Sequence, residues 1–238
     1  MISSLAIIGL AALIHASFQL SISMLTLLSG HAIGAKTAHA RLIRLTTGFL
    51  GGVVVMTLLL LSFLAFLFQR LFGSTTPSLV WAIGCGLVIG LGVAVWLFYY
   101  RREQGTSLWL PRGLARYLSE RTKATKYSAE AFGLGLSSVI AELIFTAAPI
   151  SIAALVVIHL SPGWQLVGLM LYVVISLLSL LVVHALIGSG HKLSRIQKWR
   201  ENNKRFLQFA AGGGLLVLGF YVYVDQVMAA SSLASGGF

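Results

Sequence analysis

The sequence predicts an all-α integral membrane protein, in which six transmembrane helices form two inverted three-helix repeats. Two observations carry the membrane assignment. Of the 238 residues, 58% are hydrophobic and only 10% are charged, whereas a soluble domain carries about 25% charged residues. The apolar residues are also gathered into continuous stretches, near the roughly 20 residues that a helix needs to cross a bilayer. The mean hydropathy of +0.92 therefore indicates a surface that meets lipid.

Six apolar stretches are expected to be the membrane spans. Each is continuously apolar, which favours helices over barrel strands, because barrel strands alternate over about ten residues. A helix also satisfies its own backbone polar groups in lipid. The expected spans are, in chain order, residues 5–28, 45–68, 79–100, 131–158, 166–187 and 206–224.

The basic residues predict the orientation of the chain. Sixteen of the 17 Lys and Arg residues follow the first, third or fifth expected span, and only Arg70 falls on the other side. Basic loops stay in the cytoplasm, so we expect both termini outside and a multi-pass protein of the cell inner (plasma) membrane. Nucleic-acid binding would also give the pI of about 10.3, but distribution by loop needs no nucleic acid, and none is expected as a partner. The sixteen residues are Lys36, Arg41, Arg44, Arg101, Arg102, Arg112, Arg116, Arg121, Lys123, Lys126, Lys192, Arg195, Lys198, Arg200, Lys204 and Arg205.

The spans divide into two halves within one membrane domain, residues 1–238. Residues 1–100 form the first expected repeat, 101–127 a basic cytoplasmic linker, and 128–238 the second repeat. The first span begins outside and the fourth begins inside, so the halves are inverted, as in many secondary transporters. In the linker, Pro111 is expected to start a short amphipathic helix in the headgroup layer, with an ordinary juxtamembrane loop as the alternative.

Polar residues in the fourth span are the first candidates for a site. Glu142 lies near its centre, where an acidic residue costs about 2.5–3.5 kcal/mol and needs a partner, a proton or a cavity. Ser138 and Thr146 are each four residues away, so they share its helix face. Pro149 cannot donate to the carbonyl of Phe145, which then needs another polar partner. Together these oxygens predict a compact spot that can hold a cation or pass a proton.

The first span carries a comparable polar stripe. His15, Gln19 and Ser23 are spaced by four. If the first and fourth spans pack together, His15 meets Glu142, which would relieve the cost of burying both, and both side chains are candidate metal ligands. The contact is either a static interhelical hydrogen bond or part of an ion pathway, and the sequence leaves both open.

Small residues predict close helix contacts. Gly48 and Gly52 form one GxxxG motif in the second span, and Gly86 and Gly90 form another in the third. Such spacing lets helix backbones approach closely. The one cysteine, Cys85, lies in the third span. It packs as a small hydrophobe or binds a soft metal, but a thiol–disulfide relay needs two thiols, so no redox site is expected.

Four segments resemble a known family. SFQLSISMLTLLSGHAIG at 17–34, VIAELIFTAAPISI at 139–152, GSGHKLSRIQKW at 188–199 and RFLQFAAGGGLLVLGFYVY at 205–223 resemble the DsbD/CcdA-type transmembrane domain. That family is similar to the LysE-type exporters, so the resemblance implies two inverted three-helix repeats. Its redox cysteines would fall near Leu20 and Phe145, and Gln19 replaces its first proline. Because neither position is cysteine, the resemblance does not imply electron transfer.

Two functions remain open. The first is a membrane transporter, an exporter of a small solute or metal ion through a midplane site between the first and fourth spans. The second is a non-transporting scaffold or assembly partner for another membrane or envelope protein, related to the cytochrome c biogenesis family without thiol chemistry. No nucleotide loop, HExxH or serine-triad pattern appears, so we expect no enzyme activity and no cofactor. The expected partners are the lipid bilayer and a small solute or ion.

Overall fold

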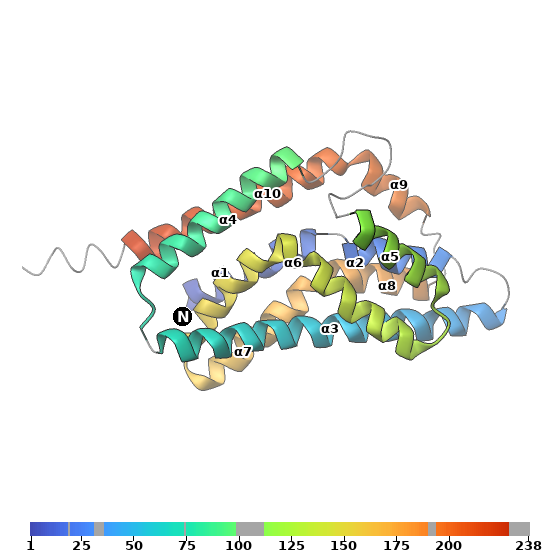
Figure 1. Ribbon diagram of the computed structural model, residues 1–238, viewed down its shortest axis with the longest axis horizontal. Coiled ribbons are helices and arrows are strands. Elements are labelled where there is room, and N and C mark those ends of the chain that lie inside the picture. The colour runs from blue at the N-terminus through green and yellow to red at the C-terminus, as the bar shows by residue number, and fades with distance from the viewer. Residues whose placement is uncertain (19, 31–35, 74, 99–111, 190–193, 229–238) are drawn as a thin grey trace, which may run out of the picture.

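The computed structural model describes the chain apart from residues 19, 31–35, 74, 99–111, 190–193 and 229–238. The described residues are almost entirely helical and include no strand (Figure 1). The elements are, in chain order, α1 (Ile2–Ser17), α2 (Leu20–Gly30), α3 (Lys36–Phe72), α4 (Ser78–Phe98), α5 (Arg112–Ala124), α6 (Ser128–Ile158), α7 (Pro162–Ser176), α8 (Leu178–Gly188), α9 (Ser194–Asn202), α10 (Lys204–Val222) and a π-helical turn, η1 (Tyr223–Met228).

Several of these helices are long and apolar enough to cross a membrane. Within the described residues there are four single ones: α3, α4, α6, and α10 with η1. Two further pairs pass the same test only together, α1 with α2 at a bend of 44° and α7 with α8 at a bend of 52°. The all-helical class is therefore confirmed for the described residues, with four helices long and apolar enough to cross a membrane, or up to six if each bent pair counts as one span.

The first and fifth spans are not the continuous helices that we expected. α1 ends at Ser17 and is followed by Phe18, whose backbone is extended (φ −76°, ψ 140°). Leu177 separates α7 from α8. Neither break has a proline or glycine beside it, so local composition gives no signal for it. The Ser17 hydroxyl donates to the carbonyl of Ile14 at 2.6 Å, a local bond that competes with helix continuation.

The expected loops around the basic residues are partly helical. α3 begins at Lys36, nine residues before the expected span, so Arg41 and Arg44 lie on a helix. The short helix that we expected near Pro111 is present as α5, beginning at Arg112. Its Leu118 is buried against the second apolar cluster described below.

The two ends of the molecule differ in charge. In Figure 1 the start of α1, the end of α3, the start of α4 and the end of α10 lie toward one end. Helices α5 and α9 and the start of α3, which carry most of the described basic residues, lie toward the other. This separation agrees with the segregation of charge by loop.

Helices α3 and α6 are in close contact through glycines. A Cβ atom on Gly48 would lie 2.8 Å from the carbonyl oxygen of Ser128. Gly52 lies against the carbonyl of Phe132 and Gly135 against the carbonyl of Phe49, with still less space for a Cβ. The Gly48/Gly52 motif is therefore a helix contact, as predicted, and it aligns α3 and α6 in parallel.

The second predicted glycine motif makes no helix contact with the part of the chain that the structure describes. A Cβ on Gly86 or Gly90 would meet no described atom within 4 Å. α4 instead packs on α10 through Gly92, where a Cβ would lie 3.0 Å from the Gly212 carbonyl oxygen. α4 has glycines on more than one face, so their spacing alone cannot select the packed one. Cys85 on this helix is 1% exposed among apolar side chains, which fits the packing interpretation.

The core consists of two apolar clusters with buried polar side chains between them. These side chains, which we call the polar layer, include His15, Ser21, Ser138 and Glu142. Along α6, Val139 and Ala141 belong to the second cluster and Phe145 to the first, so Glu142 lies where they meet. The break between α1 and α2 lies at the same boundary. The first cluster includes Ile8, Phe18, Val88, Ile150, Tyr172 and Leu218. The second includes Ile22, Leu25, Phe49, Leu134, Val173 and Leu180.

Candidate functional site

Glu142 is the acidic residue of the polar layer, and it is held by the start of a helix. Its side chain is 5% exposed. Oε1 accepts a hydrogen bond from the backbone N–H of Ser21, with 2.7 Å between the heavy atoms. Ser21 is the second residue of α2, and the first N–H groups of a helix have no partner within it. These N–H groups and the positive end of the helix dipole stabilise a carboxylate.

His15 faces the other oxygen of the same carboxylate, as the sequence predicted for packed first and fourth spans. Its Nε2 lies 3.9 Å from Oε2 of Glu142, too far for a direct hydrogen bond. Its Nδ1 lies 3.0 Å from the hydroxyl of Tyr172 on α7. These distances fit a hydroxyl that donates to Nδ1 and a ring proton on Nε2 that faces the carboxylate.

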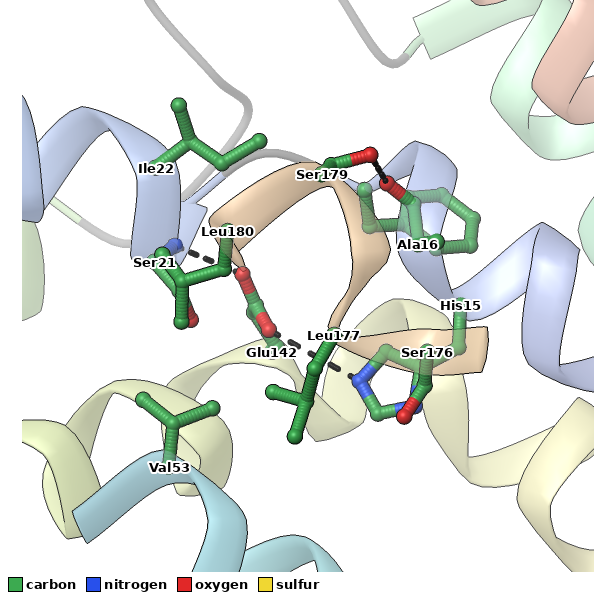
Figure 2. Close-up of a pocket in the computed structure, with 11 residues that line it drawn as sticks. His15, Ala16, Ser21, Ile22, Val53, Glu142, Ser176, Leu177, Ser179 and Leu180 are labelled. Carbon is green, nitrogen blue, oxygen red and sulfur yellow. Dashed lines mark hydrogen bonds and ion pairs between the residues drawn. The ribbon is translucent and has the colours of Figure 1, made fainter. Parts of the chain in front are cut away.

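The second broken helix meets the first at this point. The Ser179 hydroxyl, in the first turn of α8, donates to the Ala16 carbonyl near the end of α1 at 3.0 Å. A carbonyl at a helix end lacks its intrahelical partner, so this bond satisfies it. Figure 2 shows α2 and α1 on opposite sides of Glu142 and the α7–α8 break between them, with Ser21 and His15 directed at the two oxygens of Glu142.

A small cavity lies between these side chains. Its volume is about 20 Å³, enough for one water molecule. A single water molecule there would be within hydrogen-bonding reach of both Nε2 of His15 and Oε2 of Glu142, which lie 3.9 Å apart. The cavity is lined by His15, Ala16, Phe18, Ser21, Ile22, Val53, Glu142, Ser176, Leu177, Ser179 and Leu180.

The other candidates on α6 differ in their relation to the cavity. Ser138 joins the polar layer, because its Oγ lies 3.2 Å from Oγ of Ser21. Thr146 donates to the backbone carbonyl of Glu142 at 3.1 Å, so its hydroxyl is used within the helix. Pro149 is buried inside α6, which continues through it to Ile158. Ser138, Thr146 and Pro149 do not line the cavity, so among the described candidates on α6 only Glu142 reaches it.

The polar stripe predicted for the first span does not continue across the break. Gln19 lies outside the described residues. Ser23 accepts a hydrogen bond from Arg200 on α9 at 3.1 Å, away from Glu142. The break between α1 and α2 changes the helical phase, and Ser21 replaces Ser23 at the site.

Four polar residues of the site were not predicted. They are Ser21, Tyr172, Ser176 and Ser179. Tyr172 gives the clearest signal in retrospect, because its hydroxyl lies in the middle of an apolar span, whereas membrane tyrosines are enriched at the interfaces. Ser176 and Ser179 flank the break at Leu177 in an otherwise apolar sequence. Their importance depends on that break, which the sequence does not indicate.

The metal interpretation has only two ligands. Among the described residues, no three His, Cys, Asp or Glu side chains lie together as a metal site. His15 and Glu142 are the two that meet, and a tetrahedral metal site uses at least three protein ligands. The described residues therefore supply two candidate metal ligands at this point, fewer than such a site uses.

Comparison with known proteins adds no relative to this description. No protein-family model, curated protein or solved structure matches the chain.

Proposed function

We propose that this protein is a membrane transporter that exports a small solute or metal ion through the site at Glu142. The observation that carries the proposal is the convergence of two broken helices and a buried acid on one cavity. Non-helical backbone at membrane depth is tolerated where it lines a cavity or is buried in protein. Interrupted helices whose ends face the substrate or coupling ion are typical of secondary transporters.

The packing also supports two inverted repeats, α1–α4 and α6–η1, and the distribution of the basic residues supports termini that both lie outside. α3, the second span of the first half, packs along α6, the first span of the second half. In the corresponding contact, α7 from the second span of the second half packs along α1 from the first span of the first half. α4 pairs with α10, the helix in the corresponding position. The halves differ in two respects. α1 and α2 are separated by a break whereas α6 is continuous, and α7 and α8 are separated by a break whereas α3 is continuous. Export is the direction that the resemblance to the exporter families implies.

The chemistry proposed for this site is a switch in the charge of Glu142. The carboxylate holds the first turn of α2 through the Ser21 amide. When it takes up a proton or a cation, this charge-assisted bond weakens. α2 is then released at the break after Phe18 and opens a path between the two apolar clusters. His15, held by Tyr172, is the proton partner on the other side of the carboxylate.

Substitution of Glu142 tests the transport proposal. Inverted membrane vesicles from cells producing the protein are energised and supplied with a defined mixture of amino acids and divalent cations, and their contents are measured by mass spectrometry. We expect at least one component to accumulate above vesicles lacking the protein, and Glu142→Gln to abolish that accumulation with normal protein level and thermal stability. Glu120→Gln, at an exposed glutamate on α5, is the matched control and should accumulate as wild type. Full accumulation by Glu142→Gln would contradict the proposal.

A scaffold function is the second candidate, and one observation favours it. Gly86 and Gly90 leave a smooth strip on the exposed face of α4, with no described atom above either residue. Small residues at this spacing are typical of a surface that packs against another membrane helix. Under this alternative, Gly86→Leu abolishes co-purification of a membrane partner, whereas Glu142→Gln preserves it. Retention of the partner by Gly86→Leu would argue against the scaffold.

A further inference from the structure

A second and larger cavity lies away from Glu142, between α5 and the first turns of α6. Its volume is about 370 Å³, within the range of small-molecule sites. In Figure 1, α5 lies across the start of α6, toward the end of the molecule with the basic helices. Tyr117 on α5 and Tyr127 before α6 are both exposed there, and exposed tyrosines are typical of the level of lipid headgroups.

The cavity carries one charge of each sign. Arg121 contributes a guanidinium, which lies 5.9 Å from the centre of the Tyr117 ring. Glu130 contributes a carboxylate whose Oε2 accepts the backbone N–H groups of Lys126 and Tyr127, at 2.7 and 3.2 Å. Both bonds use Oε2, so Oε1 is available to a ligand. Among the described ion pairs Arg121 and Glu130 do not form one with each other, and both line the same cavity, so a ligand can lie between the two charges.

The floor of the cavity leads onto an apolar strip of α6. A Cβ on Gly133 would meet nothing within 4 Å, so the surface there is open. Ser137 follows one turn later, and Ile140 and Ile144 continue the same face, 52% and 49% exposed. Exposed isoleucines on a helix that is apolar enough to span a membrane fit the acyl chain of a lipid.

We propose that this cavity binds a phospholipid with a zwitterionic phosphoethanolamine headgroup. Arg121 binds the phosphate, Oε1 of Glu130 accepts a hydrogen bond from the ammonium group, and an acyl chain follows Ile140 and Ile144. A guanidinium suits phosphate because its N–H groups form a planar fork. A purely anionic headgroup would leave Glu130 facing negative charge, and a choline headgroup has no N–H to donate. The surrounding basic residues attract any anionic lipid. Selectivity for the ammonium group therefore distinguishes binding in this cavity from general electrostatic attraction to the basic surface.

Native mass spectrometry of the detergent-solubilised full chain tests this inference. The probes are phosphatidylethanolamine, phosphatidylcholine and phosphatidylglycerol with identical acyl chains. We expect the ethanolamine lipid to bind about fivefold more tightly than the choline lipid, the upper value for one exposed charged pair. Arg121→Gln should weaken binding of all three lipids. Glu130→Gln, which keeps an oxygen for the two amides, should remove the preference for ethanolamine over choline.

Two further variants control for folding and for general charge. Gly133→Phe fills the cavity without a backbone clash and should abolish selective binding while the thermal midpoint is kept. Arg116→Gln, on the same helix and paired with Glu120 at 3.4 Å outside the cavity, should bind as wild type. Equal binding of the ethanolamine and choline lipids by the wild type, or a preference for glycerol that Glu130→Gln leaves unchanged, would overturn the proposal. So would wild-type selectivity in a folded Gly133→Phe.

Discussion

At the scale of single residues, the site depends on how a buried carboxylate is stabilised. An acidic group at the centre of a membrane helix is costly, and Glu142 is compensated mainly by a backbone amide rather than by a cation. A hydrogen bond to a charged group contributes about 1.5–3 kcal/mol. The Ser21 amide is therefore the contact whose loss should matter most, more than the 3.9 Å approach of His15.

Two substitutions at Ser21 separate its amide from its hydroxyl. Ser21→Pro removes the N–H that Glu142 accepts, and proline is tolerated in the first turn of a helix. We expect it to abolish transport and to lower the thermal midpoint in detergent. Ser21→Ala keeps the amide and loses only the contact with Ser138, worth about 0.6 kcal/mol between membrane helices, so activity should survive. Equal behaviour of the two variants would refute the role given to the amide.

At the scale of helices, some glycines form a helix–helix interface and others are exposed on the surface of their helix. Gly52 and Gly135 place the backbones of α3 and α6 in direct contact, whereas Gly86 and Gly90 face away from the described core. A larger side chain should therefore disturb the helix contact at Gly52 or Gly135 but not at Gly86 or Gly90, and substitution can measure this difference in stability.

Alanine at these glycines should change stability in opposite directions. Gly52→Ala forces a methyl group against the Phe132 carbonyl and should destabilise the protein by about 1–3 kcal/mol. Gly86→Ala meets nothing and gains helix propensity of up to about 1 kcal/mol. Thermal unfolding in detergent, followed by circular dichroism, measures both. A Gly52→Ala variant as stable as Gly86→Ala would show that α3 and α6 are further apart than described.

The same scale shows what the sequence could predict. The helical membrane class, the approximate positions of the spans and the meeting of His15 with Glu142 followed from hydropathy, charge and helical spacing. The breaks at Phe18 and Leu177 did not, because neither has a local breaker and both depend on bonds to distant helices, such as Ser179 to Ala16. Ser21 and Ser179 became site residues only through those breaks, so no periodic pattern could select them.

At the scale of the whole molecule, the open question of four or six spans has a topological answer. If α7 and α8 together cross the membrane, their two ends lie on opposite sides; if the bent pair re-enters, both ends lie on one side. The basic residues predict a full crossing, with the α6–α7 turn outside and the region before α9 inside.

Reporter fusions after Ser161 and after Ser189 decide between these arrangements. We expect alkaline phosphatase to be active at Ser161 and inactive at Ser189, with the opposite pattern for a cytoplasmic fluorescent protein. A fusion after Ala124, in the basic linker, supplies the cytoplasmic reference. The same reporter response at Ser161 and Ser189 would mean that α7 and α8 form a re-entrant loop.

The account's central claim is that the cavity between the broken helices lies on a transport path, and thiol labelling tests it most directly. The native Cys85 is buried among apolar side chains, so the wild-type chain should not react with a membrane-impermeant maleimide. In a Cys85→Ser background, which should keep activity, Ser179→Cys places a thiol on the cavity wall. We predict that this thiol reacts from each side of the membrane during turnover, and that Glu142→Gln confines reaction to one side. A Ser179→Cys thiol that stays as unreactive as Cys85 from both sides, in an active protein, would contradict the claim.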